Sequence, residues 1–240
     1  MFIPLHDYNP LKSIKFQFVT VSLIVANVVV YVFFQTELIS PSNIQATTSF
    51  AVVPLELMSE GIFGKNVVEG VHDLIPIAER WTLLSYMFLH GNWLHLFGNM
   101  LFLWVFGDNV EDALGHFRFL IFYVLCGVFG GLAHSWLLPT SALPLIGASG
   151  AVAGVIAAYL MLHPNVRVWV LVLWRFPLPL NAGLVLGFWV ALQIFNALTE
   201  TGDNVAWWAH VGGLTAGAVL ILFMRQPGVP LFDRTPRQAA

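Results

Sequence analysis

The chain has 240 residues, of which 58% are hydrophobic and only 10% are charged. Soluble domains carry about 25% charged residues, so the composition favours a lipid bilayer as the main solvent. The formal net charge is −3 and there is no basic block, which argues against a nucleic-acid partner. The single cysteine, Cys126, rules out an intrachain disulfide.

Six apolar segments follow one another along the chain, and each is long enough to predict a helix that crosses or enters a membrane. The expected spans are 16–34, 93–107, 117–137, 147–163, 182–198 and 205–224. Pro139 and Pro144 separate the third from the fourth. We therefore expect an all-α membrane protein, a six-transmembrane-helix bundle. It forms a single domain over 1–225 with a short cytoplasmic tail at 226–240.

The basic residues predict how this bundle is oriented. If the N-terminus is cytoplasmic, only Lys65 and Arg80 of the 10 Lys and Arg residues fall outside. This bias is the positive-inside pattern, and it places both termini in the cytoplasm. The first outer loop, 35–80, is long and partly apolar, so we expect it to associate with the membrane surface.

Among the polar side chains inside the predicted spans, four stand out: His95 and Asn99 on the second, Ser149 at the start of the fourth and His210 on the sixth. Such residues are costly in a membrane and are functional candidates for that reason. The second, fourth and sixth spans all run from outside to inside. His95, Ser149 and His210 each lie near the start of a span, so we expect them at one depth, towards the outer surface.

Small residues line the faces of the fourth and sixth spans beside these polar groups. They are Gly150 and Gly154 on the fourth, and Ala206, Gly213 and Gly217 on the sixth. Small residues let membrane helices approach closely. If the two faces meet, Ser149 comes within hydrogen-bond reach of His210, and the imidazole can then take the hydroxyl proton as the oxygen attacks a carbonyl.

The segment around Ser149 also predicts a site for an oxyanion. Gly147 permits a tight turn into the helix, and the first turn of a helix has free N–H groups. His95 and Asn99, facing the same point, would add side-chain donors. No carboxylate lies in a span near His210, so the expected catalytic unit is a dyad.

Four motifs, in this order, resemble those of the rhomboid family of intramembrane serine proteases. They are WTLLSYMFLHGNWLHLFGNM at 81–100, GDNVEDALG at 107–115, GASG at 147–150 and AWWAHVGGLTAG at 206–217. The resemblance implies a six-helix bundle with Ser149 as nucleophile and His210 as general base. It also implies an oxyanion site made by His95, Asn99 and the Ser149 N–H and shaped by Gly147.

The same resemblance assigns other parts of the chain. It implies a structural role for Glu111, a membrane-embedded first loop over 35–80, and a lateral gate and cap formed by the fifth span and 199–204. Some members carry an aromatic residue where this chain has Ala153. What orients His210 is therefore open, and Trp207 is one candidate.

The expected activity is hydrolysis of a peptide bond in or next to the transmembrane helix of a single-span protein, through an acyl-enzyme. The partners are the substrate and the lipid bilayer, and a bacterial plasma membrane is the expected location. Neither cofactor nor metal is expected, because His90 and His95 lack the His-Glu-x-x-His pattern of a zinc site. Two alternatives are a non-catalytic relative that binds membrane clients and a transporter or proton channel that uses its histidines.

Overall fold

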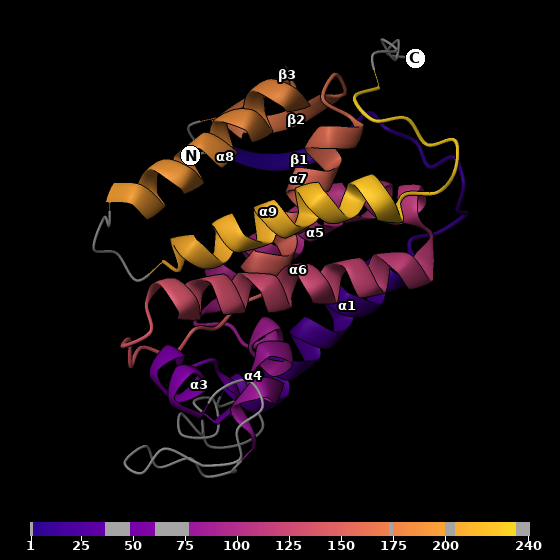
Figure 1. Cartoon of the computed structure of the whole chain (residues 1–240). Coiled ribbons are helices and arrows are strands. Elements are labelled where there is room, and N and C mark those ends of the chain that lie inside the picture. Colours follow the sequence, from indigo (N-terminus) through magenta and orange to yellow (C-terminus); the bar gives the residue numbers. More distant parts are fainter. Residues whose placement is uncertain (1, 37–48, 61–76, 173–174, 200–204, 234–240) are drawn as a thin grey trace.

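Within the part of the chain that the structure describes, six helices form the body of the protein. The structure, a computed structural model, describes residues 2–36, 49–60, 77–172, 175–199 and 205–233 (Figure 1). The long helices are α1 (Phe18–Val30, continued by η1, Tyr31–Gln35), α5 (Trp93–Leu114), α6 (His116–Leu137), α7 (Ser149–Leu162), α8 (Ala182–Thr199) and α9 (Trp207–Met224). Helix α7 packs against α5, α6 and α9 and is buried along most of its length, because it is apolar on all sides.

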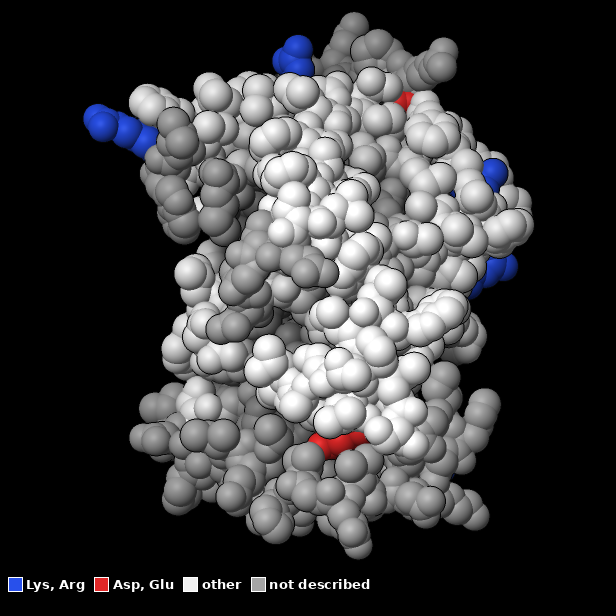
Figure 2. All heavy atoms as spheres, turned by 60° about the vertical axis from the view of Figure 1, so that its left-hand side comes forward, with Lys and Arg blue, Asp and Glu red and all other residues white. Residues whose placement is uncertain are grey.

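The helices agree with a membrane-spanning bundle. Within the described residues, four are long and apolar enough to cross a bilayer: 18–35, His116–Leu137, Ala182–Thr199 and Trp207–Met224. Helix α7 is a shorter apolar helix of 14 residues. Helix α5 continues to Leu114, past the predicted end of its span at 107. Figure 2 shows a face on which charged side chains are few and isolated from one another. The protein is therefore a helical integral membrane protein.

A three-stranded antiparallel sheet, which the all-α expectation omitted, lies at the end of α7 remote from Ser149. Its strands are β1 (Phe2–Asp7), β2 (Arg167–Val172) and β3 (Phe176–Asn181), in the order β1-β2-β3. Strand β2 follows α7 and β3 runs directly into α8. The sheet thus joins the N-terminal segment to the beginning of α8 (Figure 1).

The described part of the first loop packs on one side of the bundle. It contains α3 (Pro54–Glu60) and the start of α4 (Glu79–Ser85). Helix α4 continues past the predicted end of the loop into the 3₁₀ turn η2 (Tyr86–Phe88), and both α3 and α4 contact α6. Figure 1 shows α3 and α4 close together at the edge of the bundle. The segments 37–48 and 61–76 lie outside the described residues, so association of the whole loop with the membrane stays a prediction.

Glycines bring α7 and α9 into backbone contact. A Cβ on Gly213 would overlap the carbonyl oxygen of Gly150, and one on Gly217 would overlap that of Gly154. The two small-residue faces therefore meet. Ala206 lies at the N-cap of α9, where its carbonyl accepts the N–H groups of the first turn.

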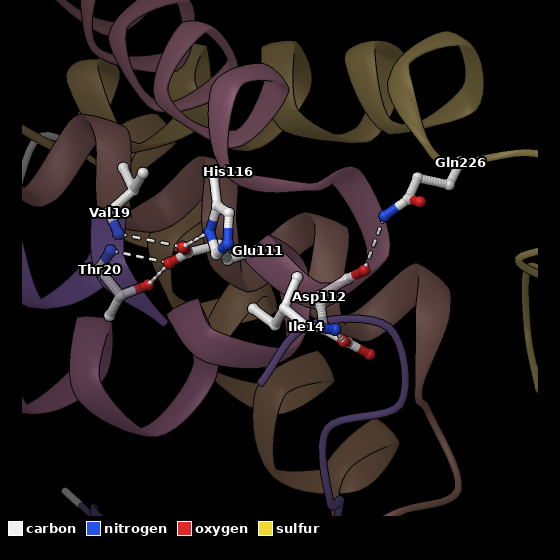
Figure 3. Close-up of polar contacts among 7 residues, drawn as sticks. All are labelled: Ile14, Val19, Thr20, Glu111, Asp112, His116 and Gln226. Atoms are coloured by element: carbon white, nitrogen blue, oxygen red, sulfur yellow. Dashed lines mark hydrogen bonds and ion pairs between the residues drawn. The ribbon is translucent and has the colours of Figure 1, made fainter. Parts of the chain in front are cut away.

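Glu111, near the C-terminal end of α5, joins α5 to α1 at the end of the bundle away from Ser149 (Figure 3). Its fully buried carboxylate accepts the N–H groups of Val19 and Thr20, at 3.0 and 2.8 Å, and the Thr20 hydroxyl at 2.7 Å. His116 Nδ1 lies 2.5 Å from the same carboxylate. Glu111 thus satisfies donors in the first turn of α1, which no helical carbonyl can reach, and its contacts are structural.

Candidate active site

Ser149 and His210 meet where α7 and α9 begin. The Oγ of Ser149 lies 2.9 Å from Nε2 of His210. His210 is 9% exposed, and Ser149, the first residue of α7, is half-buried. The glycine contacts between α7 and α9 set this distance, because Gly150 and Gly213 follow the two residues by one and three positions.

Val52 of the first loop and Tyr86 of η2 fix the chain that leads into Ser149. Val52 and Leu145 exchange two backbone hydrogen bonds, at 3.1 and 2.7 Å, and the Gly147 N–H donates to the Tyr86 carbonyl at 2.9 Å. Gly147 has a φ of +122°, a conformation that glycine adopts far more readily than other residues. Residues 145–147, just before α7 starts, are therefore held in place by backbone hydrogen bonds to Val52 and Tyr86. The first-turn N–H groups of α7 receive no side-chain cap.

His95 and Asn99 converge on Gly147. A Cβ at Gly147 would lie 2.8 Å from both Cε1 and Nε2 of His95 and 3.8 Å from Nδ2 of Asn99. The Gly91 N–H approaches His95 Nδ1 at 3.4 Å; because that nitrogen accepts, the ring proton lies on Nε2. Asn99 is buried, and its Nδ2 has no hydrogen-bond partner among the described residues. Two donors thus face one small space beside Ser149.

Gln193, Trp189 and Trp207 also contact the His210 ring. Nδ1 lies 2.8 Å from Oε1 of Gln193 on α8. The ring of Trp189 stacks on the imidazole at 6.4 Å, and Trp207 meets it edge-on at 5.7 Å. The sequence indicates Trp207 as a candidate for orienting His210 and does not identify Gln193. The signal that could have identified it is a polar side chain in an otherwise apolar helix.

His90 lies just before α5 and is 1% exposed. Its backbone N–H and carbonyl bind the side chain of Gln35, at 2.8 and 3.1 Å. The rings of His90 and His95 meet edge-on with centroids 5.1 Å apart. Burial, together with the neighbouring His95, lowers the pKa of His90 to about 4, so this ring is neutral near pH 7. His90 therefore packs against the candidate oxyanion site without adding charge to it.

A comparison with protein families matches residues 78–227 to the Rhomboid domain. That range covers more than half of the chain and includes all four candidate side chains, His95, Asn99, Ser149 and His210. The chain belongs to the rhomboid family.

Individual relatives agree with this assignment. The chain is 32% identical over 164 residues to the mitochondrial RHOMBOID-like protein 6 of Arabidopsis thaliana, covering 68% of this chain and 48% of the relative. It is 32% identical over 146 residues to the rhomboid protease GluP of Bacillus subtilis, covering 61% and 26%. With the rhomboid protease AarA of Providencia stuartii, identity is 28% over 221 residues, covering 84% and 70%. The chain spans about half the length of several of the curated relatives it matches.

Proposed function

We propose that this protein is an intramembrane serine endopeptidase with Ser149 as nucleophile and His210 as general base. The 2.9 Å distance between Ser149 Oγ and His210 Nε2 is the observation that carries the proposal. A hydroxyl is a weak nucleophile until an adjacent base can remove its proton. The names of GluP and AarA as proteases support the same reaction class.

In the proposed reaction, Ser149 Oγ attacks the peptide carbonyl as its proton moves to His210 Nε2. The resulting oxyanion receives hydrogen bonds from Nε2–H of His95, Nδ2 of Asn99 and the backbone N–H of Ser149. The C–N bond then breaks and His210 protonates the leaving amine. Water, deprotonated by His210, attacks the acyl-enzyme and releases the acid and free Ser149. The absence of a side chain at Gly147 leaves room for the oxyanion.

The proposed substrate is a single-span membrane protein cut in or next to its transmembrane helix. An intact helix satisfies its own backbone in lipid and resists attack, so a locally weak helix with small residues near the cut is favoured. We place the protein in a bacterial plasma membrane, with 1–225 as one membrane domain and 226–240 as a cytoplasmic tail. The distribution of Lys and Arg supports cytoplasmic termini and a site that opens to the outer side.

The test is cleavage of a fluorescent transmembrane reporter by the protein purified into liposomes. We expect cleavage by the wild type, and none by Ser149→Ala or His210→Ala at unchanged thermal stability. The exposed residues Ser59 and His6 provide matched controls, so Ser59→Ala and His6→Ala are expected to retain full activity. Equal cleavage by Ser149→Ala and wild type would refute the proposal.

A further inference from the structure

Gln193 is a buried amide in the middle of an apolar helix. It lies on α8 and is 5% exposed. Trp189 and Val190 of the same helix pack against an apolar cluster formed by Ala153, Ala157 and Leu214. A polar side chain in such a setting is costly unless both ends of its amide are hydrogen-bonded.

The two hydrogen bonds of Gln193 define which way its amide points. Its Nε2 donates to the Trp189 carbonyl at 3.3 Å, and a carbonyl can only accept. The amide oxygen is therefore the atom that lies 2.8 Å from His210 Nδ1. Because an amide oxygen also only accepts, Nδ1 of His210 must carry a proton to make this bond.

This proton position determines what Nε2 of His210 can do. A neutral imidazole has one N–H group, so a proton on Nδ1 leaves the lone pair on Nε2. That lone pair points to Ser149 Oγ, 2.9 Å away. In the other tautomer Nε2 would itself be a donor and could not take the hydroxyl proton. The stacked ring of Trp189 and the edge of Trp207 restrain the ring plane, but an aromatic ring does not select between tautomers.

We propose that Gln193 is a positioning residue of the active site: by accepting the Nδ1–H of His210, it holds the imidazole in the tautomer that can deprotonate Ser149. This inference rests on the proposed peptidase function. It gives a neutral amide the orienting role that a carboxylate has in a triad. The bond also crosses from α8 to α9, so the position of α8 becomes part of the catalytic geometry.

Groups on the neighbouring helices also act on His210. The rings of His95 on α5 and His134 on α6 interact with it electrostatically, and the uncharged hydroxyl of Ser149 on α7 is hydrogen-bonded to it. Trp189 and Gln193 complete the surroundings on α8. While His95 and His134 are neutral, none of these named neighbours carries a charge. A carboxylate introduced at position 193 would therefore act on the His210 imidazole without a competing charge from them.

Steady-state kinetics on Gln193→Leu, Gln193→Glu and the control Asn196→Leu test the role. Asn196→Leu removes an amide three residues along the same helix. We expect Gln193→Leu to lower kcat about tenfold or more, with KM unchanged, because a buried Nδ1–H loses its acceptor and the tautomers redistribute. Asn196→Leu should match the wild type.

Gln193→Glu separates positioning from packing. It keeps an acceptor of the same shape, so we expect activity to be largely restored. Its carboxylate should stabilise the imidazolium and move the acidic limb of the kcat/KM profile about one pH unit upward. A Gln193→Leu rate within twofold of wild type, or a Gln193→Glu variant as impaired as Gln193→Leu with an unshifted profile, would overturn the proposal.

¹⁵N NMR of the histidine side chains provides a readout that needs no substrate. With His210 assigned by comparison with His210→Ala, we expect the wild type to carry its proton on Nδ1 and Gln193→Leu to show a mixture. A wild-type proton on Nε2 would overturn the inference even if cleavage is normal. If wild type and Ser149→Ala behave alike in the cleavage assay, the peptidase proposal fails. The tautomer measurement still shows whether Gln193 accepts a hydrogen bond from the Nδ1–H of His210.

Discussion

Gly213 of α9 lies directly against the carbonyl of Gly150 on α7. These glycines stand three residues after His210 and one residue after Ser149, so the contact holds the two candidate catalytic residues at a fixed separation. The same helix pair has a second contact of this kind one turn further along, between Gly217 and Gly154. The same glycine contacts therefore determine both how closely α7 and α9 pack and how far Ser149 lies from His210.

Gly213→Ala should destabilise the protein and reduce cleavage. The added methyl overlaps backbone, which cannot move away as a side chain could, and overpacking of this kind costs about 1–3 kcal/mol. Gly187→Ala on α8 is the control, because its Cβ would meet nothing within 4 Å. Thermal denaturation in detergent and the reporter assay measure both effects. Equal melting temperatures for the two variants would contradict this packing.

Removing the Glu111 carboxylate should loosen the other end of the bundle. Glu111→Ala leaves the buried N–H of Thr20 and the part-buried N–H of Val19 without acceptors, and a buried group of this kind costs about 1–3 kcal/mol. Thr20→Val removes one hydroxyl donor and should cost only about 1 kcal/mol. Apparent stability in detergent should fall in the order wild type, Thr20→Val, Glu111→Ala. An unchanged Glu111→Ala protein would show that these bonds contribute nothing.

Asn99→Ala should slow cleavage without abolishing it. It removes one proposed oxyanion donor while His95 and the Ser149 N–H remain, and loss of one such donor lowers kcat about 10²–10³-fold. The effect should appear in kcat more than in KM, because the charge develops only in the transition state. A wild-type kcat for this variant would remove Asn99 from the oxyanion site.

Acid should destabilise the protein partly through His90. Its pKa is about 4 in the folded protein and about 6.5 when unfolded, so the unfolded state binds the extra proton between these values. Stability is therefore complete above pH 6.5 and falls as the pH drops towards 4, by up to about 3 kcal/mol. His90→Gln should show a shallower loss of melting temperature between pH 6.5 and 4. Parallel curves would contradict a buried neutral His90.

Much of this arrangement follows from residue patterns along the chain. Apolar runs predict the long helices because each must satisfy its backbone within itself in lipid. The helical spacing of Gly213 and Gly217 predicts a face that meets a second small-residue face. Contacts between segments that are far apart in the sequence are harder to predict from such patterns. Gln193 is one amide on α8, and nothing in its local sequence specifies that its partner is His210.

The sheet was missed for a different reason. Pro4 in β1 and Pro177 and Pro179 in β3 interrupt the usual strand pattern, and proline removes a donor from the ladder. The structure places all three on the edge strands β1 and β3, where an unpaired side tolerates them. The uninterrupted strand β2 lies between them. Strand β3 follows β2 closely along the chain, whereas β1 comes from the N-terminal segment, and a local pattern does not predict that distant pairing.

The most direct test of the account is covalent labelling with a fluorophosphonate, followed by mass spectrometry to locate the adduct. The central claim is that His210 activates the hydroxyl of Ser149. We expect the wild type to carry the adduct on Ser149, and His210→Ala to remain unlabelled while still folded. An adduct on a different serine, or labelling of His210→Ala at the wild-type rate, would contradict that claim.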